Sequence, residues 1–232
     1  MRILLTLLGS LISLQLAGCA SNGDPRDPLE PMNRAIHDFN EGLDRMVMKP
    51  VAQGYQAVMP GFAETGVRNF FSNLGDVGIL ANDVLQFKLE SSASDLMRLS
   101  VNSTFGLLGL LDIASEMGLH KHSEDFGQTL GRWGLSDGPY LVLPFFGASS
   151  FRDAAGLMVD LQYTDMLWYV DDIATRNQIW AVRAVSKRAE LLEAKKAMDA
   201  AALDPYEFMR DFYLEYRRNQ VYDGKPPAEA DD

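Results

Sequence analysis

The stretch Glu124-Asp-Phe-Gly-Gln-Thr-Leu-Gly-Arg-Trp-Gly-Leu-Ser-Asp-Gly-Pro-Tyr140 decides how this chain can fold. It places Gly127, Gly131, Gly134 and Gly138 three or four residues apart. Glycine at this spacing lowers helix stability by about 1 kcal/mol per residue relative to alanine. Its use therefore indicates tight turns or backbones that approach each other closely. A compact, strained helical ring fits the pattern as well as a loop does.

The segments on both sides of this stretch have helical patterns. Apolar residues recur at helical spacing in residues 31–48 and 171–202. Ser92-Ala-Ser-Asp95 and Ser150-Phe-Arg-Asp153 resemble capping boxes that open helices, and Asp204-Pro205 supplies an N-cap and a first-turn proline for a last helix. We find no run of convincing alternating strands and no internal repeat. The sequence therefore predicts a single all-α domain.

Two short stretches are apolar without having a strand pattern. They are Phe105-Gly-Leu-Leu-Gly-Leu-Leu111 and Tyr140-Leu-Val-Leu-Pro-Phe-Phe-Gly147. Each is too short to cross a bilayer as a helix, which takes about 20 residues. They can pack in the core, or they can contact lipid within one leaflet. The pattern alone favours the core.

The N-terminus reads as a secretory signal peptide, with Arg2 before an apolar run from Ile3 to Leu16. The run ends in Leu16-Ala17-Gly18-Cys19, which resembles the lipobox of bacterial lipoproteins. The alternative is that Cys19 is an ordinary buried cysteine. It is the only cysteine of the chain and has the position that a lipobox requires, so we predict that it is lipidated. Ala20, where an Asp would favour the inner membrane, indicates the outer membrane.

The polar segments at both ends of the mature chain bound the predicted domain. We expect a signal peptide over residues 1–18, a lipidated tether over 19–28, a helical domain over 29–223 and a disordered acidic tail over 224–232. These boundaries follow composition: the tether and the tail are rich in Pro, Gly and acidic residues.

Composition and motifs argue against several classes of function. The formal charge of −11 disfavours binding to nucleic acid. The sequence has no P-loop and no Gly-x-Ser-x-Gly elbow, so we expect neither catalytic residues nor a cofactor. His120 and His122 are two residues apart, do not share a helix face and lack a third ligand with its own spacing. A polar loop before a Ser123 N-cap is therefore the preferred interpretation, and no metal site is predicted.

Many ordered positions together resemble the MlaA (VacJ) family of outer-membrane lipoproteins. The resemblance runs from about Asp27 to Asp165, with one further short match at Asp204. The matching blocks are Asp27-Pro-Leu-Glu30 with Asn33-Arg34, Asn69-Phe70, Asn73-Leu74, Leu85-Gln86, Arg98 with Asn102-Ser-Thr-Phe-Gly106, Gly109, Asp112 and Ala114, Glu124 to Gly131, Gly134, Gly138-Pro-Tyr140, Pro144, Gly147, Arg152-Asp153 and Asp204-Pro-Tyr206.

The resemblance implies a monotopic helical ring with a central amphipathic channel, anchored on the periplasmic face of the outer membrane. Mislocalised phospholipids would pass from the outer leaflet through the channel to a soluble periplasmic carrier, and a trimeric porin would be a partner. It also implies that the protein is not an enzyme. Under this resemblance, at least one of the two apolar stretches contacts the membrane or the channel. The residues expected to do so are Phe105, Leu107, Leu108, Leu110, Leu111, Phe145 and Phe146.

Two other functions stay open on the residues alone. One is a lipoprotein scaffold for a porin or envelope complex that moves no lipid. The other is a periplasmic hydrolase, for example one acting on phospholipids.

Overall fold

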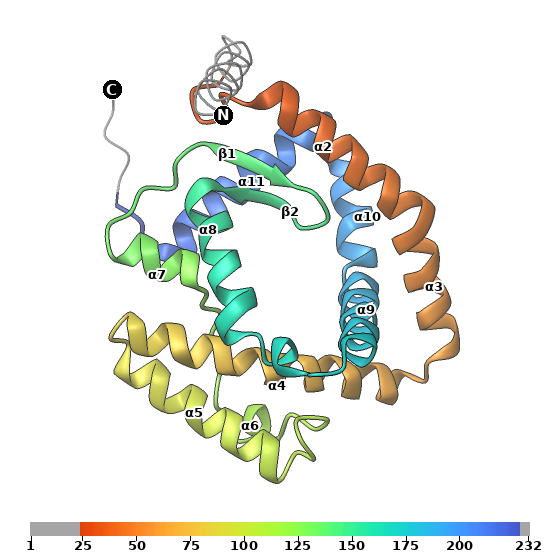
Figure 1. Ribbon diagram of the computed structural model, residues 1–232, viewed down its shortest axis with the longest axis vertical. Helices are drawn as coiled ribbons and strands as arrows, with labels where there is room; N and C mark the ends of the chain where they lie inside the picture. Colours follow the sequence, from red (N-terminus) through yellow and green to blue (C-terminus); the bar gives the residue numbers. More distant parts are fainter. Residues whose placement is uncertain (1–23, 228–232) are drawn as a thin grey trace, which may run out of the picture.

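A computed structural model describes residues 24–227, which form a ring of helices around an open centre (Figure 1). The elements are α2 (Glu30–Leu43), η1 (Asp44–Met48), α3 (Lys49–Val58), α4 (Gly61–Leu85), α5 (Leu89–Thr104), α6 (Ile113–Glu116), α7 (Phe126–Arg132), β1 (Tyr140–Leu143), β2 (Gly147–Ser150), α8 (Phe151–Val159), η2 (Asp160–Thr164), η3 (Met166–Tyr169), α9 (Ile173–Glu190), α10 (Leu192–Ala201) and α11 (Pro205–Val221). The predicted helical class is confirmed.

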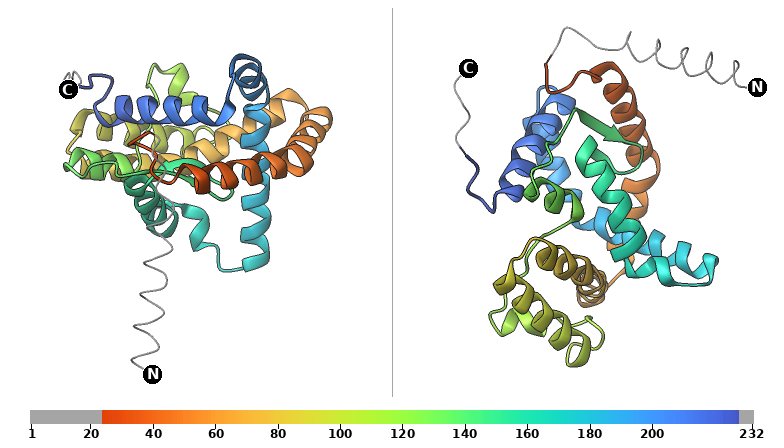
Figure 2. Two further views of the ribbon diagram at one scale, coloured as in Figure 1. Left: turned by 90° about the horizontal axis from the view of Figure 1, so that it is seen from above. Right: turned by 60° about the vertical axis from the view of Figure 1, so that its left-hand side comes forward.

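The ring is mostly flat, with α10 extending from one side and a second group of elements from the other (Figure 2, left). Seen from the side, most helices lie in one layer, and η2, η3 and the start of α9 extend beyond it (Figure 2, left). Helices α4 and α5 pack side by side at one edge of the ring, joined by a short turn. In residues 24–227, no helix is both long enough and apolar enough to cross a membrane.

A two-stranded hairpin lies where we predicted an apolar stretch without strands, so that prediction was wrong. Tyr140 pairs with Ser150 and Leu143 with Gly147 in an antiparallel register. Each strand has four residues, which is too short to show a clear alternation in the sequence. Phe145 adopts a left-handed φ of 68° in the turn, a conformation that sequence propensity disfavours for an aromatic residue.

Two asparagines of α2 cover the free edge of β1 in place of a third strand. Asn33 donates from Nδ2 to the Tyr140 carbonyl at 3.0 Å and accepts the Val142 N–H at 2.9 Å. Asn40, seven residues later, donates to the Leu143 carbonyl at 3.0 Å and accepts the Phe145 N–H at 2.9 Å. Seven residues make about two helical turns, so both amides lie on one face of α2. The backbone groups of the hairpin edge are thereby satisfied.

The glycine pattern serves both close packing and turns. A Cβ on Gly156 of α8 would lie 2.4 Å from the Gly127 nitrogen of α7, and a Cβ on Gly131 would lie 2.9 Å from the Val221 side chain. Gly134 and Gly138 have φ values of 96° and 68°. The first two glycines of the stretch therefore allow α7 to approach α8 and α11, and the last two form the turn that follows α7.

The predicted helix starts were only partly correct. Ser150 caps α8 by accepting the Asp153 N–H at 3.2 Å, and Asp204 caps α11, both as predicted. Helix α5 begins at Leu89, so Ser92 lies inside it and is not a cap. Asp125 rather than Ser123 caps α7.

Both long helical predictions are confirmed as helical, with breaks that the sequence pattern did not show. Residues 31–48 lie in α2 and in the π-helical turn η1. The segment 171–202 divides into α9 and α10 at Leu191.

Candidate functional site

The inside of the ring contains two adjoining cavities, which we call the interior hollow. Their volumes are about 200 and 240 Å³, and Asp125, Leu157 and Asp160 line both of them. The elements that supply the lining are α4, the β-hairpin, α8, η2, α9 and α11. In Figure 1, α4, the hairpin, α8 and α9 surround the centre of the ring, and α11 lies behind the hairpin. The hollow is therefore a feature of the ring as a whole.

The interior hollow is amphipathic. Its lining combines apolar side chains with charged ones from different elements, so an apolar chain and a polar group can both find partners in it. The apolar side chains are Leu74, Ile79, Leu143, Phe146, Leu157 and Leu161, and the charged ones are Glu124, Asp125, Asp153, Asp160, Asp165, Arg183 and Arg217.

Arg217 of α11 ties together two acidic groups in the wall of the hollow. Its Nε lies 2.8 Å from Asp153 Oδ2, and its Nη1 lies 2.6 Å from Asp125 Oδ2. The Tyr213 hydroxyl also donates to Asp153, at 2.6 Å. Burial raises the pKa of both carboxyls, but the hydrogen bonds and charge of Arg217 outweigh it, so both pKa values lie below the usual range. Both carboxyls of this part of the wall therefore stay ionised, and Arg217 offsets part of their charge.

Asp160 is a less compensated acid of the same wall. It accepts hydrogen bonds from the Phe126 N–H at 2.9 Å and from the Asn82 amide at 3.2 Å. Burial nevertheless raises its pKa above the ordinary value, with a further contribution from the charge of Asp125. On the α9 side, Arg183 and Asp165 form an ion pair at 2.8 Å.

A larger cavity of about 800 Å³ lies between the α2–α3 arm and α9–α11. Its lining is mostly ionic. Arg188 binds Asp44 through two hydrogen bonds of 2.5 and 2.8 Å, and Lys195 binds Glu41 at 3.0 Å. Most of its charged groups already have partners, so it forms a polar joint between the two arms of the ring.

The distribution of polarity is inverted relative to an ordinary soluble protein. Among residues 24–227, fully buried polar and charged side chains outnumber fully buried hydrophobic ones. Large apolar side chains lie on the surface of almost every element of the ring instead. Exposed apolar side chains in this number indicate contact with a membrane or another protein.

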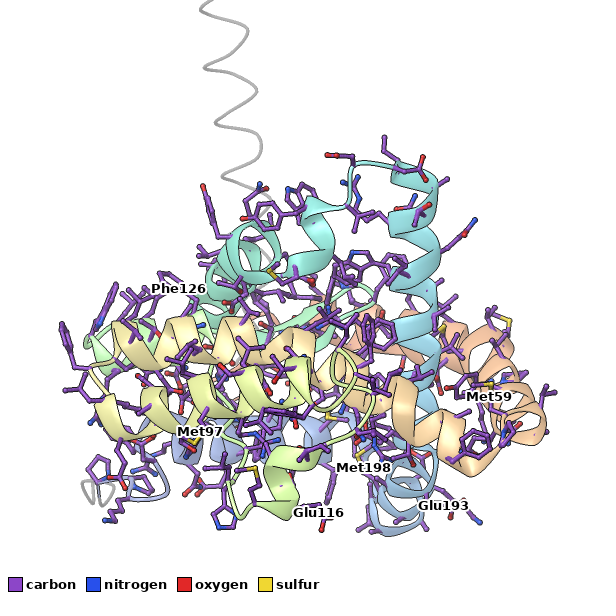
Figure 3. The ribbon with its side chains drawn as sticks, turned by 90° about the horizontal axis from the view of Figure 1, so that it is seen from below. Met59, Met97, Glu116, Phe126, Glu193 and Met198 are labelled. Carbon is purple, nitrogen blue, oxygen red and sulfur yellow. The ribbon has the colours of Figure 1, made fainter. Side chains whose placement is uncertain are left out.

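The exposed acidic side chains Glu116 and Glu193 lie on one side of the flat ring, opposite the projection formed by η2, η3 and the start of α9 (Figure 3). Met97, which is half exposed, lies nearer the mid-plane of the layer.

The five residues predicted after α5 are exposed and lie in one turn. Phe105 is 73% exposed, and Leu107 and Leu108 adopt left-handed φ values of 54° and 59°. Leu110 and Leu111 are also exposed, and Leu110 helps to line a shallow apolar groove with residues of α4 and α9. The interpretation of this stretch as core is therefore wrong, because water or a partner reaches all five side chains.

The two predicted phenylalanines of the hairpin have different surroundings. Phe145 is 71% exposed at the turn and packs edge-on against Phe39 at 5.7 Å between ring centroids. Phe146 is also exposed but lines the interior hollow. Only Phe146 among the predicted contact residues reaches the hollow. Cys19, the predicted lipidation site, lies outside the described residues.

The sequence did not point to the residues that make the wall of the hollow. Leu157, Asp160 and Leu161 follow the predicted helix start at Ser150, but no sequence motif marks them as lining residues. Their spacing of three to four residues was the available indication, because it places apolar and acidic side chains on neighbouring faces of one helix. Pairing them with Arg183 and Arg217 requires the tertiary fold.

Two acids that sequence reasoning missed lie next to His122. Its Nδ1 is 3.0 Å from Asp95 Oδ2, and Asp83 of α4 lies beside both. Burial and the neighbouring Asp95 raise the pKa of Asp83 to about 8. His120 points to solvent instead. The acidic partners of His122 therefore come from α4 and α5, which are distant from it in the sequence.

Comparison with known proteins gives a consistent result. The model of the MlaA lipoprotein family matches residues 25–220. The chain is 31% identical over 208 residues to the intermembrane phospholipid transport system lipoprotein MlaA of Escherichia coli K12, covering 86% of this chain and 82% of that protein. It is 31% identical over 231 residues to the protein of the same name from Haemophilus influenzae, covering 95% and 92%.

A solved structure from work on the structural basis for maintenance of bacterial outer membrane lipid asymmetry has a similar fold. The TM-score is 0.73 at 30% identity, and the alignment covers 84% of this chain and 98% of the other. The ring is therefore shared with that structure over nearly its whole length.

Proposed function

The chain belongs to the MlaA lipoprotein family, and from this premise we propose that it removes mislocalised phospholipids from the outer leaflet of the outer membrane. In this proposal, lipids pass through the interior hollow to a soluble periplasmic carrier, and outer-membrane lipid asymmetry is maintained. The family is one of non-enzymatic transport lipoproteins, so no lipid is chemically altered.

The observation that carries the proposal is the inverted polarity of the ring. Apolar side chains cover its outside, while acids, arginines and leucines together line the hollow. A bilayer solvates the outside of such a ring without exposing apolar surface to water. A phospholipid needs both kinds of lining, because burying an unpaired headgroup charge is costly and exposing its acyl chains to water is unfavourable.

The exposed aromatic and aliphatic side chains would allow the ring to insert into one leaflet of the membrane. Phe105, Leu107 and Leu108 form one apolar projection, and Phe145 forms another. Each fully buried Phe or Leu side chain contributes about 1.5–3 kcal/mol to partition into lipid. Together with acyl chains on Cys19, these residues would hold a ring that has no described spanning helix in the inner leaflet.

Two partners follow from the proposed route. A soluble lipid carrier must accept the phospholipid on the periplasmic side, because the acyl chains cannot cross water unprotected. A trimeric porin is the proposed membrane neighbour of the ring.

The experiment measures phospholipid in the outer leaflet of intact cells. It compares a strain lacking the gene, the same strain with the gene restored, and one restored with Cys19→Ala behind a cleavable soluble signal peptide. Phospholipid should accumulate outside on deletion, and only the lipidated form should reverse the accumulation. An unchanged leaflet on deletion would favour the scaffold function instead. Turnover of labelled phospholipid by the purified protein would favour a hydrolase.

A further inference from the structure

Outside the interior hollow, one cluster combines buried acids with a histidine. Asp83 of α4, Asp95 of α5 and His122 of the segment before α7 each offer one ligand atom, and these atoms lie within 4.8 Å of one another. They come from three segments that are separate in the sequence. From this arrangement we infer that Asp83, Asp95 and His122 form a binding site for a divalent transition-metal cation of the zinc class.

The burial of Asp83 without a hydrogen-bond partner is the observation that points to a ligand. Its side chain is completely buried, and neither carboxylate oxygen has a hydrogen-bond partner in the described part of the chain. Buried carboxylates are nearly always hydrogen-bonded, paired or bound to a metal. The nearest carboxylate is that of Asp95, also buried, so a second acid faces the first where a cation would be expected.

The neighbouring lysines do not supply the missing charge. Lys88 binds Glu124 at 2.9 Å and also pairs with Asp223. Lys121, next to His122 in sequence, pairs with Asp76. Both ammonium groups near the cluster are therefore engaged by other acids, and the ion pair that the described residues form with Asp95 is the one with the imidazole of His122.

The donor set selects the class of cation. One imidazole nitrogen and two carboxylate oxygens suit Zn²⁺ and similar divalent metals, whereas Ca²⁺ and Mg²⁺ prefer oxygen ligands alone. Tetrahedral bonds of about 2.0–2.1 Å place ligand atoms roughly 3.4 Å apart. The His122–Asp95 separation of 3.0 Å is already close to this value, and small side-chain rotations would bring in Asp83.

The exposure and position of His122 indicate how a cation would enter the site and which elements the bound ion would hold together. Its side chain is 35% exposed, so a cation can enter from solvent and keep a water as fourth ligand. The bound ion would tie the α4–α5 pair to the segment that leads into α7. Asp125, three residues after His122, caps α7 and binds Arg217 in the wall of the hollow. The bound ion would therefore stabilise one wall of the ring.

The test uses the full-length lipoprotein in detergent, without a histidine tag, stripped with EDTA and dialysed. Zinc chloride is then added, bound zinc is counted by mass spectrometry, and the unfolding midpoint is recorded. We expect one zinc per chain and, at 100 times the dissociation constant, a rise of roughly 5–10 °C in the midpoint. His122→Ala should abolish both effects, and the matched control His120→Ala should keep them.

Asp83→Asn keeps the result interpretable if His122→Ala is poorly folded. This substitution replaces a buried carboxyl, whose charged form burial disfavours, with a neutral amide of the same shape. Without zinc the variant should therefore unfold at or above the wild-type midpoint while failing to bind the ion. Absence of stoichiometric zinc in the wild-type protein would overturn the inference and leave a proton shared between Asp83 and Asp95. Equal zinc binding by wild type and His122→Ala would overturn it as well.

Discussion

Replacing Arg217 with methionine is the sharpest perturbation of the ring wall. Methionine has a similar length but no charge, so the change removes the cation and little volume. Arg217 is 8% exposed, and it binds Asp125 from α7 and Asp153 from α8. After substitution, Asp125, whose side chain is 40% exposed, loses its guanidinium partner, and the buried Asp153 keeps only Arg152, at 2.9 Å. The Tyr213 hydroxyl and the Gln128 N–H still donate to these two carboxylates.

The magnitude follows from the burial of this cluster. Removing one partner of a buried ion pair costs about 3–5 kcal/mol when the remaining charge is uncompensated. Because Asp153 keeps Arg152 and Asp125 is partly exposed, we expect a loss at or below the lower end of this range, about 2–3 kcal/mol. For a domain of this size, about 1 kcal/mol corresponds to roughly 2–4 °C in the unfolding midpoint. The substitution should therefore lower the midpoint by roughly 4–12 °C.

Thermal unfolding in detergent, followed by circular dichroism, measures the effect. The matched control is Arg132→Met, because Arg132 is 47% exposed and lies 3.7 Å from Asp223, so its loss should cost less than about 1 kcal/mol. Adding Asp125→Asn to Arg217→Met should recover part of the loss, because the carboxylate that lost its guanidinium partner is no longer charged. A loss for Arg217→Met no larger than that for Arg132→Met would refute the argument.

Three further outcomes test other parts of the structure. Gly156→Ala should lower stability by about 1–3 kcal/mol through collision with the α7 backbone, whereas Gly54→Ala, with open space around its Cβ, should not lower it; chemical denaturation compares the two. Because folding lowers the pKa of Asp153, its carboxylate contributes its full stabilisation above about pH 4 and loses it as the pH falls through the folded-state pKa. When unfolding curves are recorded at progressively lower pH, the stability of Asp153→Asn should therefore fall less than that of the wild type. Phe145→Ser in a non-lipidated Cys19→Ala protein should weaken partition into phospholipid vesicles roughly tenfold, as measured by co-flotation, and unchanged flotation would argue against membrane contact by the hairpin turn.

Much of the local structure could be read from the sequence, because its causes are local. Ser150 and Asp204 cap helices through bonds to residues two or three positions away, which sequence motifs encode. The hairpin of β1 and β2 could not be read in the same way. Its edge is held by Asn33 and Asn40, about a hundred residues distant.

For the predicted apolar contact residues, too, one part could be read from the sequence and another part depends on the tertiary structure. The stretch after α5 could be identified from hydrophobicity, but hydrophobicity alone favoured the core. Placement on the surface depends on left-handed backbone at Leu107 and Leu108, which turns the side chains outward. Asp83 and Asp95 were invisible as partners of His122 because the α4–α5 packing that joins them is tertiary.

The most direct test of the central claim narrows the interior hollow and leaves the outside of the ring unchanged. Leu157 lines both cavities of the hollow, and the adjacent Met158 is exposed. Leu157→Trp and Met158→Trp are each introduced into a strain lacking the gene at matched protein levels, and outer-leaflet phospholipid is measured on intact cells. We predict that Leu157→Trp leaves phospholipid accumulated as in the deletion strain, whereas Met158→Trp restores the normal leaflet. Equal restoration by both variants would contradict passage of lipid through the hollow.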